Sequence, residues 1–200
     1  MIDKERLAAK CAAYGIALTA QQLDRLDAYA RLLVDYNQKV NLTAITTPEG
    51  IEDRHFADSL LLAAQPEVAG AVVDVGTGAG FPGIVAKIYR PDIRLTLMEP
   101  TGKRVDFLRY ACAELGLEGV EFAKERAEEA ARKPWREQFD IACARAVAAL
   151  PVLCEYEYTV YTGCFSTKTN TYYYNRFDDF EMKSVQFTEE NMNADKVTIY

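Results

Sequence analysis

One stretch of the sequence has residue types and spacing suited to holding a nucleotide-like cofactor. An apolar run ends at Asp74, and glycines follow at every second position, Gly76, Gly78 and Gly80. Glycine lets the backbone turn sharply and approach a ligand closely, because it has no Cβ. A helix is predicted to begin at Pro82, and a helix N-terminus offers N–H groups and a partial positive charge to an anion. The stretch therefore predicts a cofactor-binding loop.

A carboxylate is expected beside this loop. The next apolar run, residues 94–99, ends in Glu99. An acid at the end of the second strand can accept hydrogen bonds from both hydroxyls of a ribose. The alternative is a glycine turn with a surface glutamate, but strand, loop, helix, strand and acid together are more specific than the glycines alone.

Two cofactor classes fit the loop. Residues 78–83 match the G-x-G-x-x-G pattern of dinucleotide-binding proteins, which would suit a nicotinamide-dependent oxidoreductase. The longer pattern Asp74-x-Gly76-x-Gly78-x-Gly80 instead resembles the first motif of S-adenosylmethionine-dependent methyltransferases. Phe81 and Pro82 fill the space that a pyrophosphate would need. We therefore expect S-adenosylmethionine, with the oxidoreductase as the alternative.

The elements that must position these residues alternate after Pro66. Strands are predicted at 71–75, 94–99, 120–123 and 139–143, with helices at 82–89, 103–115 and 125–132. This rhythm predicts the α/β class, with a parallel Rossmann-like sheet covered by helices on both faces.

Residues 1–65 are predicted to form an N-terminal helical extension. A short helix is expected at 3–14. A second begins at the capping box Thr19-x-x-Gln22, in which the two side chains satisfy each other's backbone donors. A third is expected at 48–64, with Thr47 as its cap and a proline at its first position.

The single histidine, His55, lies on the third predicted helix, three residues before Asp58. It is either a surface histidine paired with Asp58 or part of a site. With one histidine and five scattered cysteines that include no C-x-x-C, no metal site is expected. Cys112 and Cys143 fall on apolar faces and are expected to fill the core.

The composition limits how the chain can bind nucleic acid or a membrane. The chain has 200 residues, enough for one well-buried domain, and a net charge of −7, so no global basic field attracts nucleic acid. A nucleic-acid partner must therefore use a local patch. No apolar run is long enough for a membrane span, and the charged beginning does not resemble a secretory signal, so a cytoplasmic protein is expected. No feature indicates an oligomeric state.

The composition changes sharply near residue 154. Residues 155–200 contain no leucine and hold 11 of the 22 aromatic residues. This tail is either a distinct appendage or a C-terminus of separate origin. Strands are predicted at 156–161, 183–187 and 196–200, and whether they complete the sheet stays open. The expected division is 1–65, 66–154 and 155–200.

Over residues 1–154 the sequence resembles the bacterial small-subunit (16S) ribosomal RNA guanine-N7 methyltransferases, also called glucose-inhibited division protein B. Six stretches in order carry the resemblance: Tyr36-Asn-x-x-Val-Asn-Leu-Thr43, Arg54-His-x-x-Asp-Ser59, Val73-Asp-Val-Gly-Thr-Gly-Ala-Gly-Phe-Pro-Gly83, Glu99-Pro-Thr-Gly-Lys-Arg-Val-Asp-Phe-Leu108, Arg126-Ala-Glu-Glu129 and Phe139-Asp-x-x-x-x-Arg-Ala146.

The resemblance implies methyl transfer from S-adenosylmethionine to a guanine N7 in 16S ribosomal RNA, either naked or in the small-subunit particle. It also implies a set of cofactor contacts: Gly76 and Phe81 at the methionine half, Glu99 at the ribose, Ala127 and Glu128 at the adenine, and Arg145 in the pocket towards the substrate. No general base is apparent. Guanine N7 has a lone pair and no proton to lose, so the transfer needs alignment more than acid–base help.

Positions near the expected pocket mouth are Asn41, His55, Asp58 and Ser59. Lys103 and Arg104 begin the helix just after Glu99 and are candidates for contacts with RNA phosphate.

The family continues after residue 154 with a Pro-Gly-Gly turn and a Lys-Gly pair that this chain lacks. A further alternative is therefore a family member that binds cofactor without catalysis, or a binding module built on the N-terminal helices.

Overall fold

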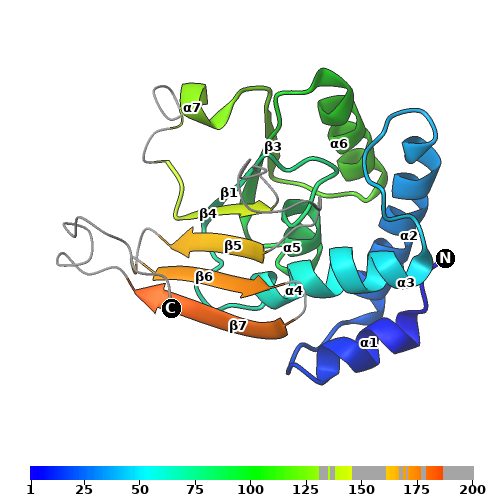
Figure 1. The fold of residues 1–200 in the computed structure, drawn as a ribbon. Helices are drawn as coiled ribbons and strands as arrows, with labels where there is room; N and C mark the ends of the chain where they lie inside the picture. Colours follow the sequence, from blue (N-terminus) through cyan, green and yellow to red (C-terminus); the bar gives the residue numbers. More distant parts are fainter. Residues whose placement is uncertain are drawn as a thin grey trace, which may run out of the picture.

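The computed structural model describes residues 1–130, 135, 138–145, 161–166, 169, 171–176 and 179–186. The strands are β1 Ala71–Val75, β2 Arg94–Met98, β3 Val120–Ala123, β4 Ile141–Arg145, β5 Tyr161–Ser166, β6 Thr171–Arg176 and β7 Asp179–Gln186. They form one sheet in the order β3-β2-β1-β4-β5-β6-β7 (Figure 1). The predicted α/β class is confirmed.

The helices cover the sheet, and α4 packs against β5, β6 and β7. They are α1 Lys4–Ala12, α2 Ala20–Asn37, α3 Pro48–Gly50, the π-helix η1 Ile51–Ala57, α4 Asp58–Ala63, α5 Gly83–Tyr89, α6 Gly102–Glu114 and α7 Ala127–Ala130. In Figure 1 the helices from α1 to α4 lie together on the right of the sheet. No helix among the described residues has the length and apolar character needed to cross a membrane.

The parallel half of the sheet follows the expected topology. β1 lies between β2 and β4 and pairs with both in parallel, and β3 pairs with β2 in parallel. The predicted strands 71–75 and 120–123 match the observed bounds. The fourth strand was expected at 139–143 and lies two residues later; Asp140, just before it, still contacts β1, because its N–H donates to the Ala71 carbonyl and its carboxylate accepts from the Ala71 N–H, both at 2.8 Å.

Side chains alternate between two apolar cores along the buried strands. On β1, Val72 belongs to the large core that α2, α4, α5 and α6 build, whereas Val73 belongs to a smaller core on the opposite face. Ala130 of α7 packs into the smaller core. The crossovers before and after β3 therefore place helices on opposite faces, as parallel connections of one handedness require. Cys112 and Cys143 are buried, as predicted.

The N-terminal helices also form as predicted. The capping box at the start of α2 is present, with Thr19 accepting from the Gln22 N–H and Gln22 accepting from the Thr19 N–H. Thr47 caps α3, and the predicted helix over 48–64 is one run through α3, η1 and α4. Its central turn is a π-helix, which sequence periodicity did not indicate. Single π turns occur frequently at functional sites.

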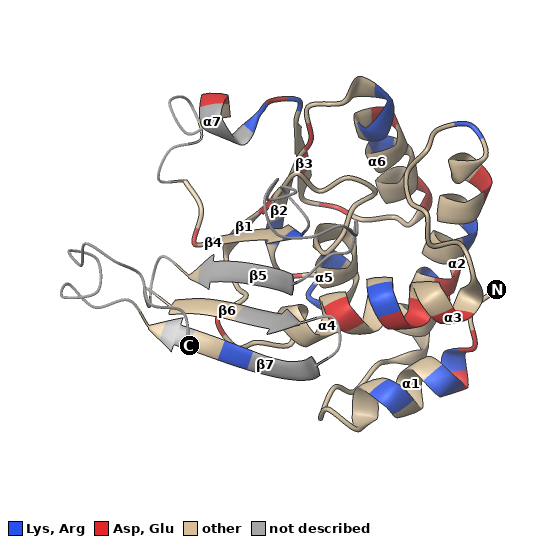
Figure 2. Ribbon diagram, in the orientation of Figure 1, with Lys and Arg blue, Asp and Glu red and all other residues tan. Residues whose placement is uncertain are grey.

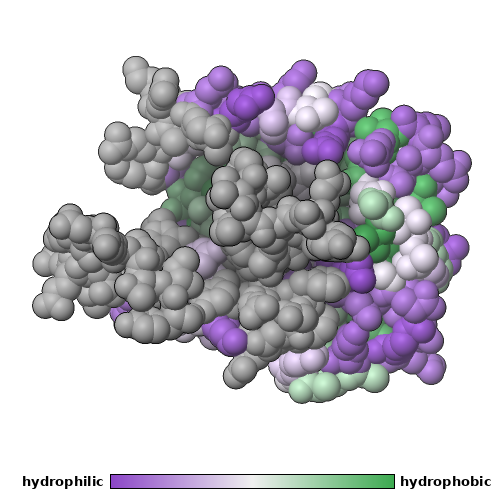
Figure 3. All heavy atoms as spheres, in the orientation of Figure 1, coloured by the Kyte–Doolittle hydropathy of each residue, from purple (hydrophilic) through white to green (hydrophobic). Residues whose placement is uncertain are grey.

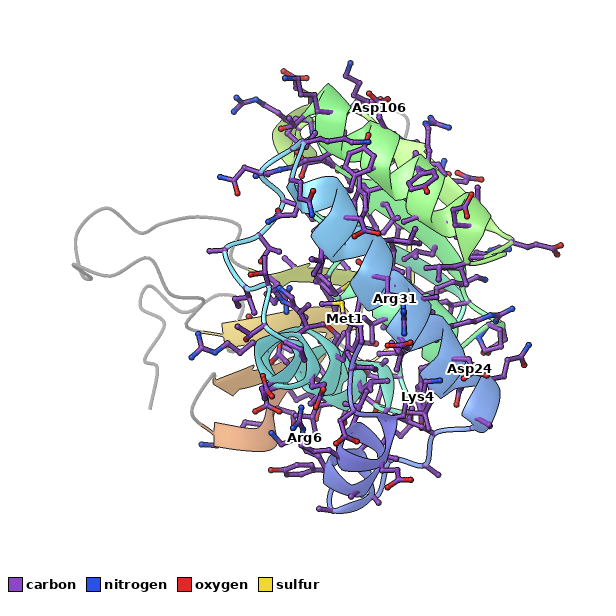
Figure 4. The ribbon with its side chains drawn as sticks, turned by 90° about the vertical axis from the view of Figure 1, so that its right-hand side faces the viewer. Met1, Lys4, Arg6, Asp24, Arg31 and Asp106 are labelled. Carbon is purple, nitrogen blue, oxygen red and sulfur yellow. The ribbon has the colours of Figure 1, made fainter. Side chains whose placement is uncertain are left out.

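Ion pairs join the N-terminal helices to one another. Figure 4 shows Lys4 of α1 beside Asp24 of α2, where their charged atoms lie 2.6 Å apart. In the same view Met1 lies near Arg31. The N-terminal ammonium and the Arg31 guanidinium both contact Asp27, at 2.5 and 2.9 Å. These charges serve helix packing within the extension.

The strands of the tail extend the same sheet in the antiparallel sense. β5 pairs with β4, with Cys164 opposite Cys143, and β6 and β7 continue the meander. The predicted strand 183–187 lies largely within β7, which begins earlier. β6 was not predicted. Most of the predicted strand 156–161, and all of 196–200, lie outside the described residues.

The described surface mixes both charges. Figure 2 shows Lys and Arg alternating with Asp and Glu along α1 and along the run from α3 to α4. In Figure 3 the residues on the right-hand side are largely hydrophilic, with apolar residues in small separate areas.

Two glycines that begin helices provide a matched test of packing. A Cβ on Gly83 would lie 2.6 Å from Leu97 Cδ2 and 2.7 Å from Asp74 Oδ2, whereas one on Gly102 would meet only the flexible end of Lys124, at 3.0 Å. We expect Gly83→Ala to lower the free energy of unfolding by about 1–3 kcal/mol through overpacking. Gly102→Ala is expected to change it by less than about 0.5 kcal/mol. Urea unfolding of both variants checks this, and equal losses would contradict it.

Candidate cofactor and substrate site

The candidate site lies where the strand order reverses. β1 is the first strand of the sheet in sequence and has β2 on one side and β4 on the other. In open α/β sheets ligands bind at such a point, outside the carboxyl ends of the strands. Three charged residues meet this edge: Asp74 from β1, Glu99 directly after β2 and Arg145 at the end of β4.

The glycines of the loop have different structural roles. Gly76, Gly78 and Gly80 all have positive φ angles, of 64°, 59° and 99°. A Cβ on Gly80 would lie 2.6 Å from the Tyr29 hydroxyl, so this glycine is required by packing. At Gly78 the nearest atom to such a Cβ would be the Gly76 carbonyl oxygen, 3.9 Å away. Gly78 is therefore the position at which a ligand can approach the backbone.

The start of α5 is already hydrogen-bonded within the protein. Pro82 has no N–H, the Gly83 N–H donates to Asp74 Oδ2 at 2.8 Å, and the Ile84 N–H donates to the Gly80 carbonyl at 2.8 Å. A pyrophosphate needs such N–H groups at a helix N-terminus. Their use inside the loop disfavours the dinucleotide interpretation of residues 78–83.

Asp74 is wholly buried and one of its oxygens is unpaired. Oδ2 accepts from the Thr77 hydroxyl at 2.5 Å and from Gly83. Oδ1 is buried and has no hydrogen-bond partner among the described residues. Burial raises the pKa of this carboxyl to about 6. A buried acceptor without a partner carries a desolvation cost, which a ligand with a cationic N–H group, such as the ammonium of an amino acid, would offset.

Glu99 is held beside Gly78. Its Oε2 accepts from the Gly78 N–H at 3.1 Å and its Oε1 from the Thr101 N–H at 2.9 Å, while Arg104 Nη1 lies 3.8 Å from Oε2. The residue is only 2% exposed. A carboxylate has about four acceptor positions, so two backbone bonds leave capacity for a pair of hydroxyls. These contacts fit the ribose of S-adenosylmethionine.

Arg145 is a buried cation fixed by three elements. Its Nη1 donates to the Arg54 carbonyl oxygen at 2.8 Å and lies 3.4 Å from Asp58 Oδ2. Its Nη2 lies 3.1 Å from His55 Nδ1. The guanidinium lies over the Phe81 ring, 4.8 Å from the centroid. Burial lowers the pKa of Arg145 and Asp58 opposes this, but arginine stays charged in proteins.

His55 is buried, so its interpretation as a surface histidine paired with Asp58 is wrong. The residue is 6% exposed, and its ring stacks on Phe81 at 4.2 Å with an interplanar angle of 12°. Nε2 lies 3.0 Å from the Thr43 hydroxyl and Nδ1 faces Arg145. Burial first, and then Arg145, lower the pKa of His55 to about 3. The π turn places this ring inside the site.

Other predicted positions lie around this cluster. Asn41 and Lys103 are exposed, and Ser59 is buried with its hydroxyl donating to the His55 carbonyl at 2.6 Å. Ala127 and Glu128 begin α7, but their side chains lie outside what the structure describes, so their role at an adenine stays a prediction.

Comparison with known proteins assigns the family. The family model GidB, described as rRNA small subunit methyltransferase G, matches residues 22–168. The chain belongs to the GidB family. This match extends 14 residues past position 154, where the resemblance was expected to end.

Two curated relatives named ribosomal RNA small subunit methyltransferase G are similar to this chain. The protein of Moorella thermoacetica is 49% identical over 78% of this chain and 67% of its own length, and that of Alkaliphilus metalliredigens is 46% identical over 73% and 62%. About a third or more of each relative therefore lies outside the match. A solved structure, of a putative O-methyltransferase from Klebsiella pneumoniae, aligns with 76% of this chain and 78% of its own at 13% identity and a TM-score of 0.47.

The sequence analysis did not identify two residues of the candidate site. Thr43 ends one of the family stretches but was not singled out, and it contacts His55 directly. Tyr29 was treated only as part of a helix, although its hydroxyl donates to the Ala79 carbonyl at 2.5 Å and its ring lies 5.2 Å from Phe81. A tyrosine among the apolar residues Leu26, Ala30 and Leu33 of this helix was the available indication.

A cavity of about 500 Å³ lies elsewhere in this GidB chain. The first residues of β1, β2 and β3, together with Trp135 and Phe139, line it. It is therefore at the amino ends of the strands, opposite the glycine loop. No group of three or more possible metal ligands occurs among the residues that the structure describes.

The buried His55 gives a prediction for the pH dependence of stability. Its pKa is about 3 when folded and about 6.5 when unfolded, so the unfolded chain binds the proton first as the pH falls. The stabilisation is complete above pH 6.5 and is lost as the pH falls towards 3. Relative to His55→Asn, the wild-type protein should lose about 2 kcal/mol of unfolding free energy between pH 7 and 5.

Asp74 acts in the opposite direction. With its pKa raised to about 6, the folded state binds a proton before the unfolded chain does, so acidification stabilises it. The wild-type protein and the His55→Asn variant both retain Asp74, so the contribution of Asp74 cancels when their stabilities are compared. Denaturant unfolding at pH 7, 6 and 5 measures the difference. Parallel stability curves for the two proteins would show that His55 does not stay neutral.

Proposed function

We propose that this chain binds S-adenosylmethionine at the carboxyl edge of β1 and β2 and transfers its methyl group to N7 of a guanine in small-subunit (16S) ribosomal RNA. The observation that carries the cofactor assignment is the loop itself: Gly78 is open beside the Glu99 carboxylate, while the start of α5 has its N–H groups occupied. Membership of the GidB family supports the substrate. Such a substrate places the protein in the cytoplasm.

Each residue of the site has a binding or orienting task in this proposal. Glu99 accepts the ribose hydroxyls, and Asp74 Oδ1 accepts from the ammonium of the methionine half. Arg145 provides a positive donor at the mouth. The bound cofactor supplies a methyl group activated by its sulfonium charge. The protein then has to align that methyl group with the guanine and exclude water.

No side chain is needed as a base. Guanine N7 attacks with a lone pair and releases no proton, and His55 is not available for that role because both of its nitrogens have partners. An acid–base dyad at this mouth would serve a different reaction. N7 transfer requires no such dyad.

The tail supports a second candidate, cofactor binding without methylation. In this proposal residues 66–154 bind the cofactor, 1–65 form the helical extension and 155–200 are the tail. β5 runs antiparallel to β4, and the family match ends at residue 168. β5 lies within that match, whereas β6 and β7 follow it, so the sheet beyond β5 is built from residues outside the family pattern.

Calorimetric titration of the intact chain with S-adenosylhomocysteine, followed by methylation assays, separates these candidates. One-to-one binding together with labelled 7-methylguanine in 16S RNA, as naked RNA or as small-subunit particles, supports the enzyme. Binding without methylation of either substrate supports the second candidate. A cooperatively folded chain that does not bind would overturn both.

Replacing Glu99 should weaken cofactor binding. Glu99→Ala removes the acceptor for the ribose hydroxyls and for the Gly78 N–H. The dissociation constant for S-adenosylhomocysteine should rise by roughly 10- to 100-fold, or about 1.5–3 kcal/mol. Glu114→Ala, on the exposed end of α6, is the matched control and should bind like the wild type. An unchanged constant for the Glu99 variant would refute the site.

Lys103 should contribute one phosphate contact to RNA binding. It is exposed at the start of α6, directly after the strand that ends beside Glu99. Lys103→Ala should lower the slope of log K against log salt concentration by about one unit. Lys4→Ala is the control, because Figure 4 shows Lys4 far from α6, beside Asp24. Equal slopes for the two variants in filter-binding assays would exclude the contact.

A further inference from the structure

We propose that His55 is a positioning residue for Arg145: it accepts a hydrogen bond from the guanidinium in a tautomer set by Thr43, and so holds Arg145 against Phe81 at the mouth of the pocket. Its effect on catalysis rests on the proposed function. The contact itself does not, because it is a property of the folded chain.

The donors and acceptors determine the tautomer. An arginine nitrogen only donates, so His55 Nδ1, 3.1 Å from Arg145 Nη2, must be the unprotonated acceptor. The ring proton is then on Nε2, which donates to Thr43 Oγ1 at 3.0 Å. Thr43 Oγ1 also accepts from the Ile45 N–H at 3.0 Å. Both acceptor positions of this hydroxyl oxygen are occupied, which holds the histidine in the Nε2–H form.

Arg145 needs this acceptor because its charge is largely removed from water and few protein acceptors replace that water. Its side chain is 10% exposed, and the nearest carboxylate oxygen, on Asp58, is 3.4 Å away. The Arg54 carbonyl and His55 Nδ1 provide the shorter contacts. A neutral imidazole supplies an acceptor without adding a second cation. Together with the Phe81 face, these contacts fix the plane of the guanidinium.

The arrangement leaves part of Arg145 for a ligand. Two Nη1 hydrogens and one Nη2 hydrogen are assigned to Arg54, Asp58 and His55. The Nε–H and the second Nη2–H have no partner among the described residues. Orienting three donors orients the remaining two, because the guanidinium is a rigid plane. His55 thereby determines where Arg145 presents its charge to an acceptor group in the pocket.

The contact also connects the N-terminal extension to the sheet. Asn37 at the end of α2 accepts from the N–H groups of Leu42 and Thr43 and donates to the Thr43 carbonyl at 3.0 Å. This loop holds Thr43, Thr43 orients His55, and His55 orients Arg145 of β4. Asn37 and Thr43 of the N-terminal extension thus act through His55 on a charge at the mouth of the pocket.

Two substitutions separate positioning from packing. His55→Phe keeps an aromatic ring on Phe81 but leaves Arg145 Nη2 without an acceptor. His55→Asn gives up the stacked ring but places an amide oxygen near the position of Nδ1. We expect His55→Phe to lose at least about tenfold in kcat/KM for methyl transfer, more than His55→Asn loses, because charge-assisted bonds are the stronger ones. The melting temperatures should rank in the opposite order.

Nitrogen NMR of histidine-labelled protein tests the contact without any activity. His55 is the single histidine of the chain, so every imidazole signal belongs to it. The expected spectrum shows a protonated Nε2 and an unprotonated Nδ1, unchanged from pH 8 to 5. A protonated Nδ1, or titration within this range, would overturn the proposal.

The outcomes distinguish the two proposals. If the wild type shows the expected tautomer but neither binds S-adenosylhomocysteine nor methylates RNA, the His55–Arg145 contact stands and the proposed function fails. If the wild type methylates 16S RNA and the two variants rank by melting temperature alone, the function stands and the positioning role fails. Both proposals are supported if the wild type methylates 16S RNA and shows the expected nitrogen NMR spectrum, and if His55→Asn retains more methyl-transfer activity than His55→Phe.

Discussion

Asp74 Oδ2 accepts one hydrogen bond from the Thr77 hydroxyl inside the glycine loop and another from the Gly83 N–H that begins α5. A single buried atom therefore ties strand, loop and helix together. This constraint explains why Gly83 has no room for a side chain, since a Cβ would meet Asp74 itself. The other oxygen of the carboxylate, Oδ1, has no hydrogen-bond partner within the part of the chain that the structure describes.

The buried charges of the site depend on one another. Arg145 opposes the rise in the pKa of Asp74 that burial causes, and Glu99 adds to that rise. His55 has to remain neutral beside Arg145, and its burial against Phe81 of the large core favours the neutral form. The result is a mouth with one cation held by neutral and acidic acceptors, next to a loop with two carboxylates. A ligand with both cationic and hydroxyl groups complements such a distribution.

Local patterns predicted those parts of the structure whose causes are local. The capping box at Thr19 and the apolar run 71–75 gave correct elements because neighbouring residues decide caps and buried strands. β6 was missed because Tyr172, Tyr173 and Tyr174 show no alternation, and pairing with β5 and β7 makes the strand. The burial of His55 depends on Thr43 and Arg145, and Arg145 is 90 residues away, so helix periodicity does not reveal it.

The two halves of the sheet also differ in how far the local sequence determines them. β4 needs a neighbour for its backbone groups on the side away from β1, because unpaired strand edges are unfavourable when buried. β5 satisfies this need through backbone bonds, which many sequences can make, and in doing so it changes the direction of the sheet. The contacts described for the cofactor loop come from β1, β2, β4, α5 and the helical extension. The strands that follow the family match, β6 and β7, therefore extend the sheet beyond β5 and leave those contacts in place.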